Sequence, residues 1–407
     1  MLTIEIKRLD MKITKIETIP ITMPVGFFKD GMCKVEGVDA LLPYYPGKPL
    51  RRRRRTTPED AVLLDNVIVK IHTDEGLKGI GACAPDIGFF GEPWESVKYI
   101  IDNYMAPIIA GMDPFDREHI FYALTRSGGW HNVLATSGID LAVHDLLGKV
   151  LNVPVNKLLG GCHQEKILLS TEVPRGTSEK MVEHSLEYYD QGVRGFKAKI
   201  GSDPRRDAES LKAMREALGY KVSFRADANQ GYTPKEAIKM CRLVEKYDVD
   251  LELLEQPCKK WDLDGMARVV KAVDTPIEAD ESAFSLFDVM RIIKKGAADV
   301  INAKVAKAGG CYGVKKWAAL AEAANLGCVI GTEWGIGCQI AAKLHLGAST
   351  KNVHPVIEFT EIMIHDTLLK EPLELKDGYL SIPAKPGLGL ELDDRKIEKY
   401  RTPAILE

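Results

Sequence analysis

Short apolar runs alternate with longer amphipathic stretches from residue 166 to residue 359. The runs have the length of buried strands, and the stretches between them have the apolar spacing of helices. Seven charged residues each lie at or just past the end of a run, at steps of 28, 28, 25, 24, 29 and 25 residues: Lys199, Asp227, Glu255, Asp280, Lys304, Glu333 and Glu358. A strand, a helix and their two turns need about that many residues, so the pattern predicts a (β/α) barrel with charged strand ends at one mouth.

The predicted barrel has eight strands, in the segments ILLSTE, RGFKAKIG, SFRADANQG, LELLEQP, PIEADES, DVINAKVAKAGG, CVIGTE and HPVIEF. Helix starts between them are marked by Asp203-Pro204 and by the capping box from Thr233 to Glu236. No helical pattern follows the eighth strand directly, so we expect an α/β fold of the TIM-like (β/α)7β type. The segment at residues 374–393 reads as a return to the first part of the chain.

The chain before the barrel has a mixed pattern. Residues 11–25 alternate apolar and polar positions as a half-buried strand does, and residues 66–82 repeat this around a turn at Asp74 to Gly76. Helical patterns follow at residues 95–109, 115–126 and 137–151, the last starting near Ser137 or Gly138. Strands followed by helices indicate an α+β domain.

These patterns divide the chain into a capping domain and an inserted barrel. We expect the α+β capping domain at residues 1–164, the catalytic barrel at residues 165–359, and a C-terminal return to the capping domain at residues 360–407. Residues 1–10 precede a second methionine, Met11, and could form a disordered extension.

Composition favours a globular enzyme and excludes several other classes. The 407 residues suit a barrel with a second domain, and 45% hydrophobic with 28% charged residues is an ordinary globular balance. A formal charge of −3 gives no general attraction to nucleic acid or to anionic membranes. We see no apolar run of about 18 residues and no signal-peptide core. The eight cysteines are scattered without a CxxC pair, which favours a cytoplasmic location.

A long loop rich in Gly, Pro, Tyr and Arg separates the first two predicted strands. It contains Tyr44, Tyr45 and five consecutive arginines from Arg51 to Arg55. A loop this long inside a compact domain is more often functional or mobile than idle. The arginine run is read either as a solvated, flexible stretch or as a lid that brings positive charge to an anionic substrate.

Three acidic residues, Asp227, Glu255 and Asp280, end the third, fourth and fifth barrel strands. Neighbouring strands lie about 4.8 Å apart, so three adjacent strand ends can converge on one ion. Three unpaired carboxylates would repel each other, and a hard cation removes this difficulty. Oxygen ligands favour Mg²⁺, with Mn²⁺ as the alternative. The competing interpretation is that each acid pairs with a lysine or arginine of the barrel.

Lysines flank the three acids. Lys197 and Lys199 alternate on the second strand and should both face the barrel interior, while Lys304 ends the sixth strand across the mouth. Neighbouring ammonium groups and a cation lower a lysine pKa toward the range of a base. We expect Lys199 and Lys304 to act as bases, Lys197 to tune Lys199, and Lys307 to belong to the following loop. Two opposed lysines suit removal and return of a proton α to a carboxylate, with a metal stabilising the ene-diolate.

The segments FKAKIG, RADANQG, LLEQP, EADES, NAKVAKAGG and PGLGLELD together resemble the enolase superfamily. Within it, the chain is similar to the muconate-cycloisomerase subgroup of the mandelate racemase/muconate lactonising enzyme family, over nearly its whole length. A lysine base with Mg²⁺ is a known pattern of this superfamily. The resemblance implies that Asp227, Glu255 and Asp280 bind the metal, and that Lys199 and Lys304 are the acid–base pair.

The resemblance also assigns substrate contacts. Glu358 is expected to hydrogen-bond the substrate carboxylate or enolate, and loops at residues 25–64 and 85–94 to determine the substrate. Asn229, Glu333 and Trp334 are further candidates for substrate binding. The segment GTEWGIG brings Glu333 and Trp334 closer to the seventh strand than in many members of the subgroup, so the pocket wall there should differ.

Several alternatives stay open. The same lysines serve racemisation or epimerisation, cycloisomerisation and syn-dehydration; two-base geometry favours an isomerase over a lyase. A His-Asp dyad, as in other subgroups, is not offered by the sixth and seventh strands. His345 is expected to be a packed helix residue, His354 to lie at a strand start, and His131, beside Trp130, to lie near the mouth at most. A non-catalytic metal-binding scaffold would leave the lysines idle.

The partner expected for this enzyme is a small-molecule carboxylate, with no nucleic acid and no membrane. Enzymes that resemble this chain form dimers and octamers, so a homo-oligomer is expected.

Overall fold

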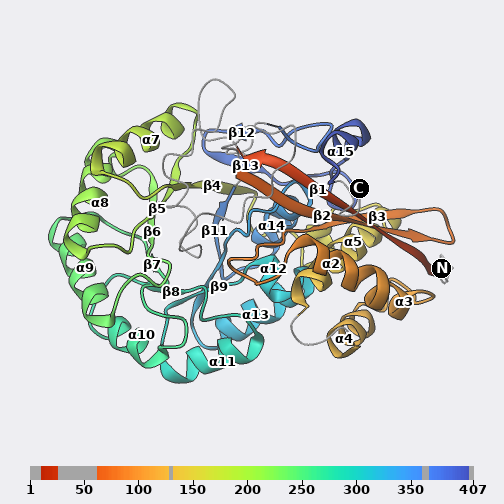
Figure 1. The fold of residues 1–407 in the computed structure, drawn as a ribbon, viewed down its shortest axis with the longest axis horizontal. Helices are drawn as coiled ribbons and strands as arrows, with labels where there is room; N and C mark the ends of the chain where they lie inside the picture. Colours follow the sequence, from red (N-terminus) through yellow and green to blue (C-terminus); the bar gives the residue numbers. More distant parts are fainter. Residues whose placement is uncertain (1–10, 26–61, 128–131, 360–365, 403–407) are drawn as a thin grey trace, which may run out of the picture.

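The computed structural model describes residues 11–25, 62–127, 132–359 and 366–402 (Figure 1). Residues 1–10, the arginine run with Tyr44 and Tyr45, and the Trp130–His131 pair lie outside these ranges. The disordered extension, the arginine-rich lid and the placement of His131 therefore stay predictions.

A closed parallel barrel forms one half of the molecule, on the left in Figure 1. Neighbouring strands pair in chain order, and the last strand pairs with the first to close the ring. The strands are β4 (Lys166–Val173), β5 (Gly195–Lys199), β6 (Ser223–Asp227), β7 (Leu254–Glu255), β8 (Ile277–Ala279), β9 (Val300–Asn302), β10 (Gly327–Ile330) and β11 (Val353–Glu358). This barrel, with its capping domain, confirms the predicted fold class.

Helices cover the outside of the barrel. They are α7 (Ser178–Asp190), α8 (Pro204–Leu218), α9 (Pro234–Lys246), α10 (Leu263–Val270), α11 (Leu286–Lys295), α13 (Cys311–Ala323) and α14 (Cys338–Ser349). The short helix α12 (Val305–Ala308) follows β9 and packs against α5. The expected signals start two of the outer helices, because Asp203 caps α8 and Thr233 forms a capping box with Glu236 on α9. Within the described ranges, no helix directly follows β11.

The capping domain holds a three-stranded antiparallel sheet and a group of helices, on the right in Figure 1. The elements are β1 (Ile13–Val25), β2 (Val62–Thr73), β3 (Lys78–Cys83), α2 (Trp94–Ile100), the π-helical turn η1 (Ile101–Met105), α3 (Ala106–Ile109), α4 (Arg117–Ser127), α5 (Val133–Val150) and α6 (Val155–Leu158). The predicted hairpin is present, with its turn between β2 and β3.

Helix α5 packs across this sheet and begins earlier than expected. The prediction of a start at Ser137 or Gly138 is wrong, because Leu134 and Ala135 are already helical and fully buried in the capping core. Ser137 does not cap the helix; its hydroxyl donates to the carbonyl of Leu134 inside it. The helix approaches β3 closely: a Cβ on Gly81 would lie 2.2 Å from the carbonyl oxygen of Gly138, so a side chain there would separate the two elements.

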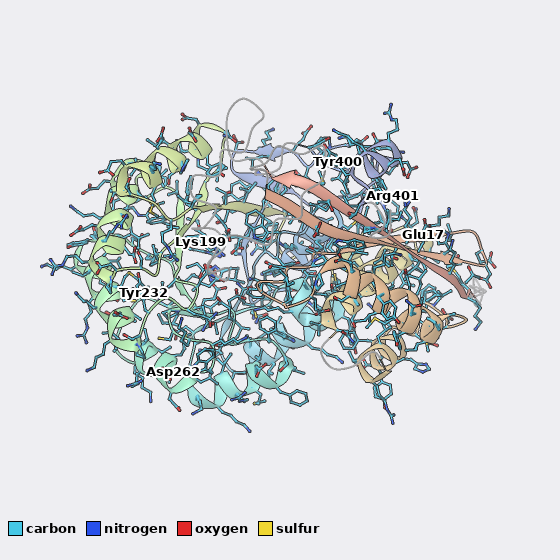
Figure 2. All side chains as sticks on the ribbon, viewed as in Figure 1. Glu17, Lys199, Tyr232, Asp262, Tyr400 and Arg401 are labelled. Atoms are coloured by element: carbon cyan, nitrogen blue, oxygen red, sulfur yellow. The ribbon has the colours of Figure 1, made fainter. Side chains whose placement is uncertain are left out.

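The C-terminal segment connects the two domains. Strands β12 (Leu375–Lys376) and β13 (Tyr379–Ser381) extend the barrel sheet, where β13 pairs antiparallel with β4. Helix α15 (Asp394–Tyr400) then lies against β1, and the backbone of Thr402 donates to the carbonyl of Pro20 at 2.9 Å. Figure 2 shows Tyr400 and Arg401 beside this part of the capping sheet. In the described ranges, no helix combines the length and apolarity that crossing a membrane requires.

Candidate active site

The strand β5 places two lysines inside the barrel. Its residues Gly195–Lys199 are all buried, and the alternation of a strand sends Lys197 and Lys199 to the same side. Lys197 is 2% exposed and Lys199 6% exposed, and Figure 2 shows Lys199 within the ring of barrel helices. The expected inward orientation of both lysines is therefore what the structure shows.

Asp227, Glu255 and Asp280, which we call the acid triad, lie at three consecutive strand ends. Asp227 ends β6, Glu255 ends β7, and Asp280 directly follows β8. Asp227 and Glu255 are register partners, and each member of the triad is 1% exposed. The three carboxylates therefore lie at neighbouring strand ends, as their spacing in the sequence predicted.

Lysine ammonium groups contact every carboxylate of the acid triad. Lys199 Nζ lies 2.8 Å from Asp227 Oδ2, and Lys197 Nζ lies 3.0 Å from Glu255 Oε2. Lys304 Nζ lies 2.7 Å from Asp280 Oδ2. These contacts match the competing interpretation in which strand-end acids pair with barrel lysines, so the choice between pairing and metal binding depends on the balance of charge.

That balance disfavours the negative charge of Glu255 in the absence of a cation. Burial raises the pKa of Glu255 well above its ordinary value, and the nearby Asp227 raises it further, while Lys197 lowers it. In contrast, burial also acts on Glu358, but Lys197 and Lys304 together lower the pKa of Glu358 to about 2. A carboxylate that is crowded by other carboxylates is suited to bind a cation.

The lysines themselves differ from the expectation. Burial lowers the pKa of Lys199, but the carboxylates of Asp227 and Glu172 outweigh it and raise the pKa above the ordinary value. The pKa of Lys304 is also raised, because Asp280 and Glu255 outweigh burial. These shifts are opposite to the expected lowering, since the nearest charges are carboxylates rather than ammonium groups, and the expected effect of a bound cation stays a prediction. A cation bound by those carboxylates would compete with the lysines for the same oxygens.

Two residues at the mouth were missed or misplaced. Glu172, near the end of β4, lies 2.9 Å from Lys199 Nζ, and its position 27 residues before Lys199 fits the barrel period. Lys307 was expected in a loop, which is wrong: it lies in α12, is 1% exposed, and its Nζ lies 2.5 Å from Asp280 Oδ1. The short helix that follows β9 directs this lysine toward the mouth. A helix of four residues is too short to show a repeating spacing of apolar residues in the sequence.

The four candidates for substrate binding occupy different places. Glu358 ends β11, where its carboxylate accepts from Lys197 Nζ at 2.5 Å and from the backbone of Thr332 at 2.8 Å. Asn229 donates its backbone N–H to Asp227 Oδ1 and its side-chain amide to Glu281. Their roles toward a substrate stay predictions.

The other two candidates lie on the loop after β10. Trp334 has a positive φ of 63° and packs against an apolar cluster of β1, β2 and the C-terminal segment. Glu333 is 3% exposed, and neither of its carboxylate oxygens has a hydrogen-bond partner among the described residues. These two side chains therefore face different surroundings, although they are adjacent in the chain.

Part of the second predicted substrate loop covers the mouth. The ring of Phe89 has its centroid 4.1 Å from Lys304 Nζ, and it stacks on Phe284 with a centroid distance of 5.1 Å. An aromatic face beside an ammonium group is a favourable electrostatic contact. The segment at residues 85–94 thus reaches Lys304, and its role in determining the substrate stays a prediction.

His345 and His354 lie away from the acid triad, in packed or strand positions. His345 is fully buried in α14, where one ring nitrogen accepts from the backbone of Asn156 and the other lies 3.2 Å from the carbonyl of Leu388. His354 lies near the start of β11 and contacts Arg225. Both placements agree with the expectation.

A second buried polar group lies between α5 and α13. Asp140, His144 and Cys311 each offer a ligand atom, and in the described ranges these form the one such set of three within 4.8 Å of one another. Both nitrogens of His144 are nevertheless engaged: Nδ1 donates to the carbonyl of Asp140 at 2.8 Å, and Nε2 accepts from Arg117 at 3.2 Å. We call Asp140, His144, Cys311 and Arg117 the junction cluster, because it joins the capping domain to the barrel.

A capped parallel barrel with lysines and carboxylates at its strand ends defines a class of enzymes that use acid–base chemistry at the mouth. Known protein families agree with this class. Residues 48–160 match the family description "Mandelate racemase / muconate lactonizing enzyme, N-terminal domain", and residues 180–396 match "Enolase C-terminal domain-like". The chain belongs to the mandelate racemase/muconate lactonizing enzyme family of the enolase superfamily, which confirms the resemblance seen in the sequence.

Relatives within this family are named as isomerases. An L-Ala-D/L-Glu epimerase from Clostridium acetobutylicum is 33% identical, over 84% of this chain and 95% of the relative. A chloromuconate cycloisomerase from Cupriavidus pinatubonensis is 28% identical, over 86% of this chain and 95% of the relative. The structure of a dipeptide epimerase from Enterococcus faecalis, complexed with Mg and the dipeptide L-Leu-L-Tyr, has a TM-score of 0.80 and 28% identity, covering 93% and 99% of the two chains. The chain is therefore an enolase-superfamily isomerase.

Proposed function

We propose that this protein is a Mg²⁺-dependent racemase or epimerase that exchanges the proton α to the carboxylate of an amino-acid derivative. One observation carries the proposal: Lys199 on β5 and Lys304 after β9 lie four strands apart in an eight-stranded ring, on opposite sides of the acid triad. Two bases on opposite sides of one carbon are the arrangement that inversion requires.

The acid triad would hold the metal, with Mn²⁺ as the alternative to Mg²⁺. The fit rests on the donor set, which is three buried carboxylates at adjacent strand ends, and on the raised pKa of Glu255 among its neighbours. When bound, the cation supplies electrostatic stabilisation of the negative charge that develops on the carboxylate oxygens of the substrate.

The residues of this chain have distinct roles in the proposal. Lys199 Nζ removes the α-proton from one face, and Lys304 Nζ delivers a proton to the other; in the reverse direction the roles exchange. Lys197, held between Glu255 and Glu358, positions these carboxylates and provides positive charge beside Lys199. Glu358 hydrogen-bonds the substrate. Lys307 Nζ donates hydrogen bonds to the carboxylate and to the backbone carbonyl of Asp280, and so holds Asp280 in place.

Relatives support an amino-acid derivative as the substrate. One relative is named L-Ala-D/L-Glu epimerase, and a similar structure is that of a dipeptide epimerase with the dipeptide L-Leu-L-Tyr. Cycloisomerisation of a diene diacid is the second candidate, because a similar protein is named chloromuconate cycloisomerase. Syn-dehydration remains the alternative within the same chemistry.

Proton exchange in D₂O tests the proposal. The protein with Mg²⁺ is incubated with dipeptides, N-acyl amino acids, free amino acids, muconates and sugar acids, and NMR follows the loss of each α-proton signal. We expect exchange with an amino-acid derivative, abolished by chelator for both enantiomers and lost for one enantiomer in Lys199→Ala. Lactone formation from a muconate would establish the second candidate instead, and no exchange with any acid would reject the proposed function.

We further propose a cytoplasmic homo-oligomer with domain boundaries near residues 164 and 359. Seven cysteines are free in the described ranges, which supports a reducing compartment. Light scattering on the purified chain tests the oligomeric state.

A further inference from the structure

Two buried ionic side chains beside the mouth have no partner among the described residues. Glu333 is 3% exposed and Lys343 is fully buried, and neither carboxylate oxygen of Glu333 nor Nζ of Lys343 makes a hydrogen bond there. Their ionised forms carry opposite charges, but the two side chains form no hydrogen bond with each other. Buried charges are normally paired and hydrogen-bonded, so this pair needs an explanation.

The surroundings place the pair next to the reaction centre. Glu333 follows Thr332, whose backbone N–H donates to Glu358 at 2.8 Å. Lys343 lies in α14, one turn after Gln339, whose amide nitrogen donates to the carbonyl of Ala82 in the capping sheet. The side chains therefore lie where the loop after β10, helix α14 and the capping domain meet.

The charges that act on Glu333 and Lys343 also indicate that the pair lies beside the mouth of the barrel. Burial raises the pKa of Glu333, and the positive charges of Lys343 and Lys304 are the largest influences that oppose it. Burial lowers the pKa of Lys343, and Glu333 and Glu358 are the largest influences that oppose it. Glu333 and Lys343 thus interact electrostatically with each other. Glu333 also interacts with Lys304, the proposed base, and Lys343 with Glu358, the proposed substrate contact.

We propose that Glu333 and Lys343 bind the amide group attached to the α-carbon of the substrate. The carboxylate of Glu333 accepts a hydrogen bond from the amide N–H, and the ammonium of Lys343 donates one to the amide carbonyl. This inference rests on the proposed function and specifies its substrate class: a dipeptide or an N-acyl amino acid, rather than a free amino acid or a diacid.

Charge supports an amide over other groups. A second carboxylate would be attracted by Lys343 but repelled by Glu333, and an ammonium group would have the reverse difficulty. An amide is neutral and offers one donor and one acceptor, which matches a pair made of one acceptor and one donor. The two buried charges are then both hydrogen-bonded when substrate is present.

A comparison of amide and ester substrates tests the inference. The probes are L-Leu-L-Tyr, L-Ala-L-Glu and their depsipeptide analogues, in which an ester oxygen replaces the N–H on the reacting carbon. α-Proton exchange in D₂O gives kcat/KM for each with Mg²⁺ present. For the wild type we expect a preference of about 10- to 100-fold for a dipeptide over its ester, since a buried hydrogen-bonding group is left unpaired with the ester.

The variant Glu333→Leu with Lys343→Met removes both charges together, so no single buried charge is left alone. We expect its preference for the dipeptide to fall to within about threefold. The intrinsic difference between ester and amide is the same for both enzymes and cancels in the ratio. The matched control is Lys370→Met with Glu391→Leu, an exposed pair at 3.0 Å, which should keep the wild-type preference.

The outcomes separate the two claims. Equal preference in the wild type and the double variant, or no preference in the wild type, would overturn the inference and indicate a pair bridged by water alone. Because the wild-type measurement needs no mutation, a variant that fails to fold does not prevent the test. Exchange of free amino acids without exchange of dipeptides would overturn the inference but keep the proposed function, whereas no exchange of any acid overturns both.

Discussion

The barrel mouth and the junction cluster are both buried, polar and rich in metal-binding residue types, but they satisfy their charges differently. In the junction cluster, both ring nitrogens of His144 have protein partners, and the backbone of Tyr312 donates to Asp140 at 3.3 Å. At the mouth, Lys197, Lys199, Lys304 and Lys307 meet a larger set of carboxylates, formed by Glu172, Asp227, Glu255, Asp280 and Glu358.

If the acid triad holds the metal, as proposed, residue type and proximity alone are poor guides to a metal site. The junction cluster has its ligand atoms closer together, yet hydrogen bonds already occupy its histidine. Lysines contact each carboxylate of the acid triad, yet burial and the neighbouring Asp227 keep the pKa of Glu255 raised. On this account, a buried carboxylate beside other carboxylates is a better indicator of a cation site than a set of ligand atoms that already have hydrogen-bond partners.

The largest expected effect comes from removing one carboxylate of the mouth. Glu255→Gln keeps the size of the side chain but removes a negative charge from the acid triad, so α-proton exchange should fall by about 10³-fold. Calorimetric titration should show that Mg²⁺ binding weakens in parallel. Cys311→Ser in the junction cluster is the control, and it should bind Mg²⁺ as the wild type does; an unchanged exchange rate in Glu255→Gln would reject the metal site.

A pH effect on stability is expected from His345, which lies in α14 and contacts α6 and the C-terminal segment. Burial lowers the pKa of His345 from 6.5 to about 4, so the folded protein keeps this ring neutral. Between pH 6.5 and 4 the unfolded chain binds a proton that the folded chain does not, and stability falls as the pH falls. At about 1.36 kcal/mol for each pH unit, this contribution amounts to about 3 kcal/mol.

Urea unfolding of the wild type and His345→Gln between pH 4 and pH 7 measures this contribution. The wild type should lose more stability than the variant as the pH decreases, because glutamine does not titrate. Equal pH dependence in the two proteins would show that His345 accepts a proton in the folded state.

A smaller effect is expected in the junction cluster. Arg117→Leu leaves Nε2 of the buried His144 without its donor, which should lower the free energy of unfolding by about 1–3 kcal/mol. Exchange activity should stay within about threefold of the wild type, since this cluster joins domains and does not touch the mouth. Thermal unfolding and the D₂O exchange assay measure both quantities, and a large loss of activity without loss of stability would contradict the comparison.

The smallest effect is an expected absence of a spectroscopic signal. Co²⁺ added in place of Mg²⁺ should bind through carboxylate oxygens and show no charge-transfer absorption from a thiolate, because burial raises the pKa of the Cys311 thiol well above its ordinary value. A thiolate band that disappears in Cys311→Ser would show instead that the junction cluster binds metal.

The parts of the site that the sequence predicted are those that depend on the barrel period. The repeat length of one strand and one helix is enough to place four residues at strand ends: Asp227, Glu255, Asp280 and Lys304. Glu172 fits the same repeat, although the sequence analysis did not name it as a site residue. Lys307 was misplaced because its position depends on the four-residue helix α12, which is too short to show a period.

Lys343 shows a second limit of sequence analysis. It lies within the apolar stretch of α14, and only the packed structure reveals that its ammonium group is fully buried beside Glu333. The lysine pKa values show a third limit. Their direction depends on which charges lie nearest in space, and Asp227 together with Glu172 raises the pKa of Lys199.

The central claim is that Lys199 and Lys304 work on opposite faces of the α-carbon. The most direct test is α-proton exchange in D₂O with the separate enantiomers of one substrate, using wild type, Lys199→Ala and Lys304→Ala with Mg²⁺ present. The account predicts that the wild type exchanges both enantiomers, and that each variant retains exchange of only one, with opposite preference. Loss of both enantiomers in one variant, with full exchange of both in the other, would show a single base and contradict the account.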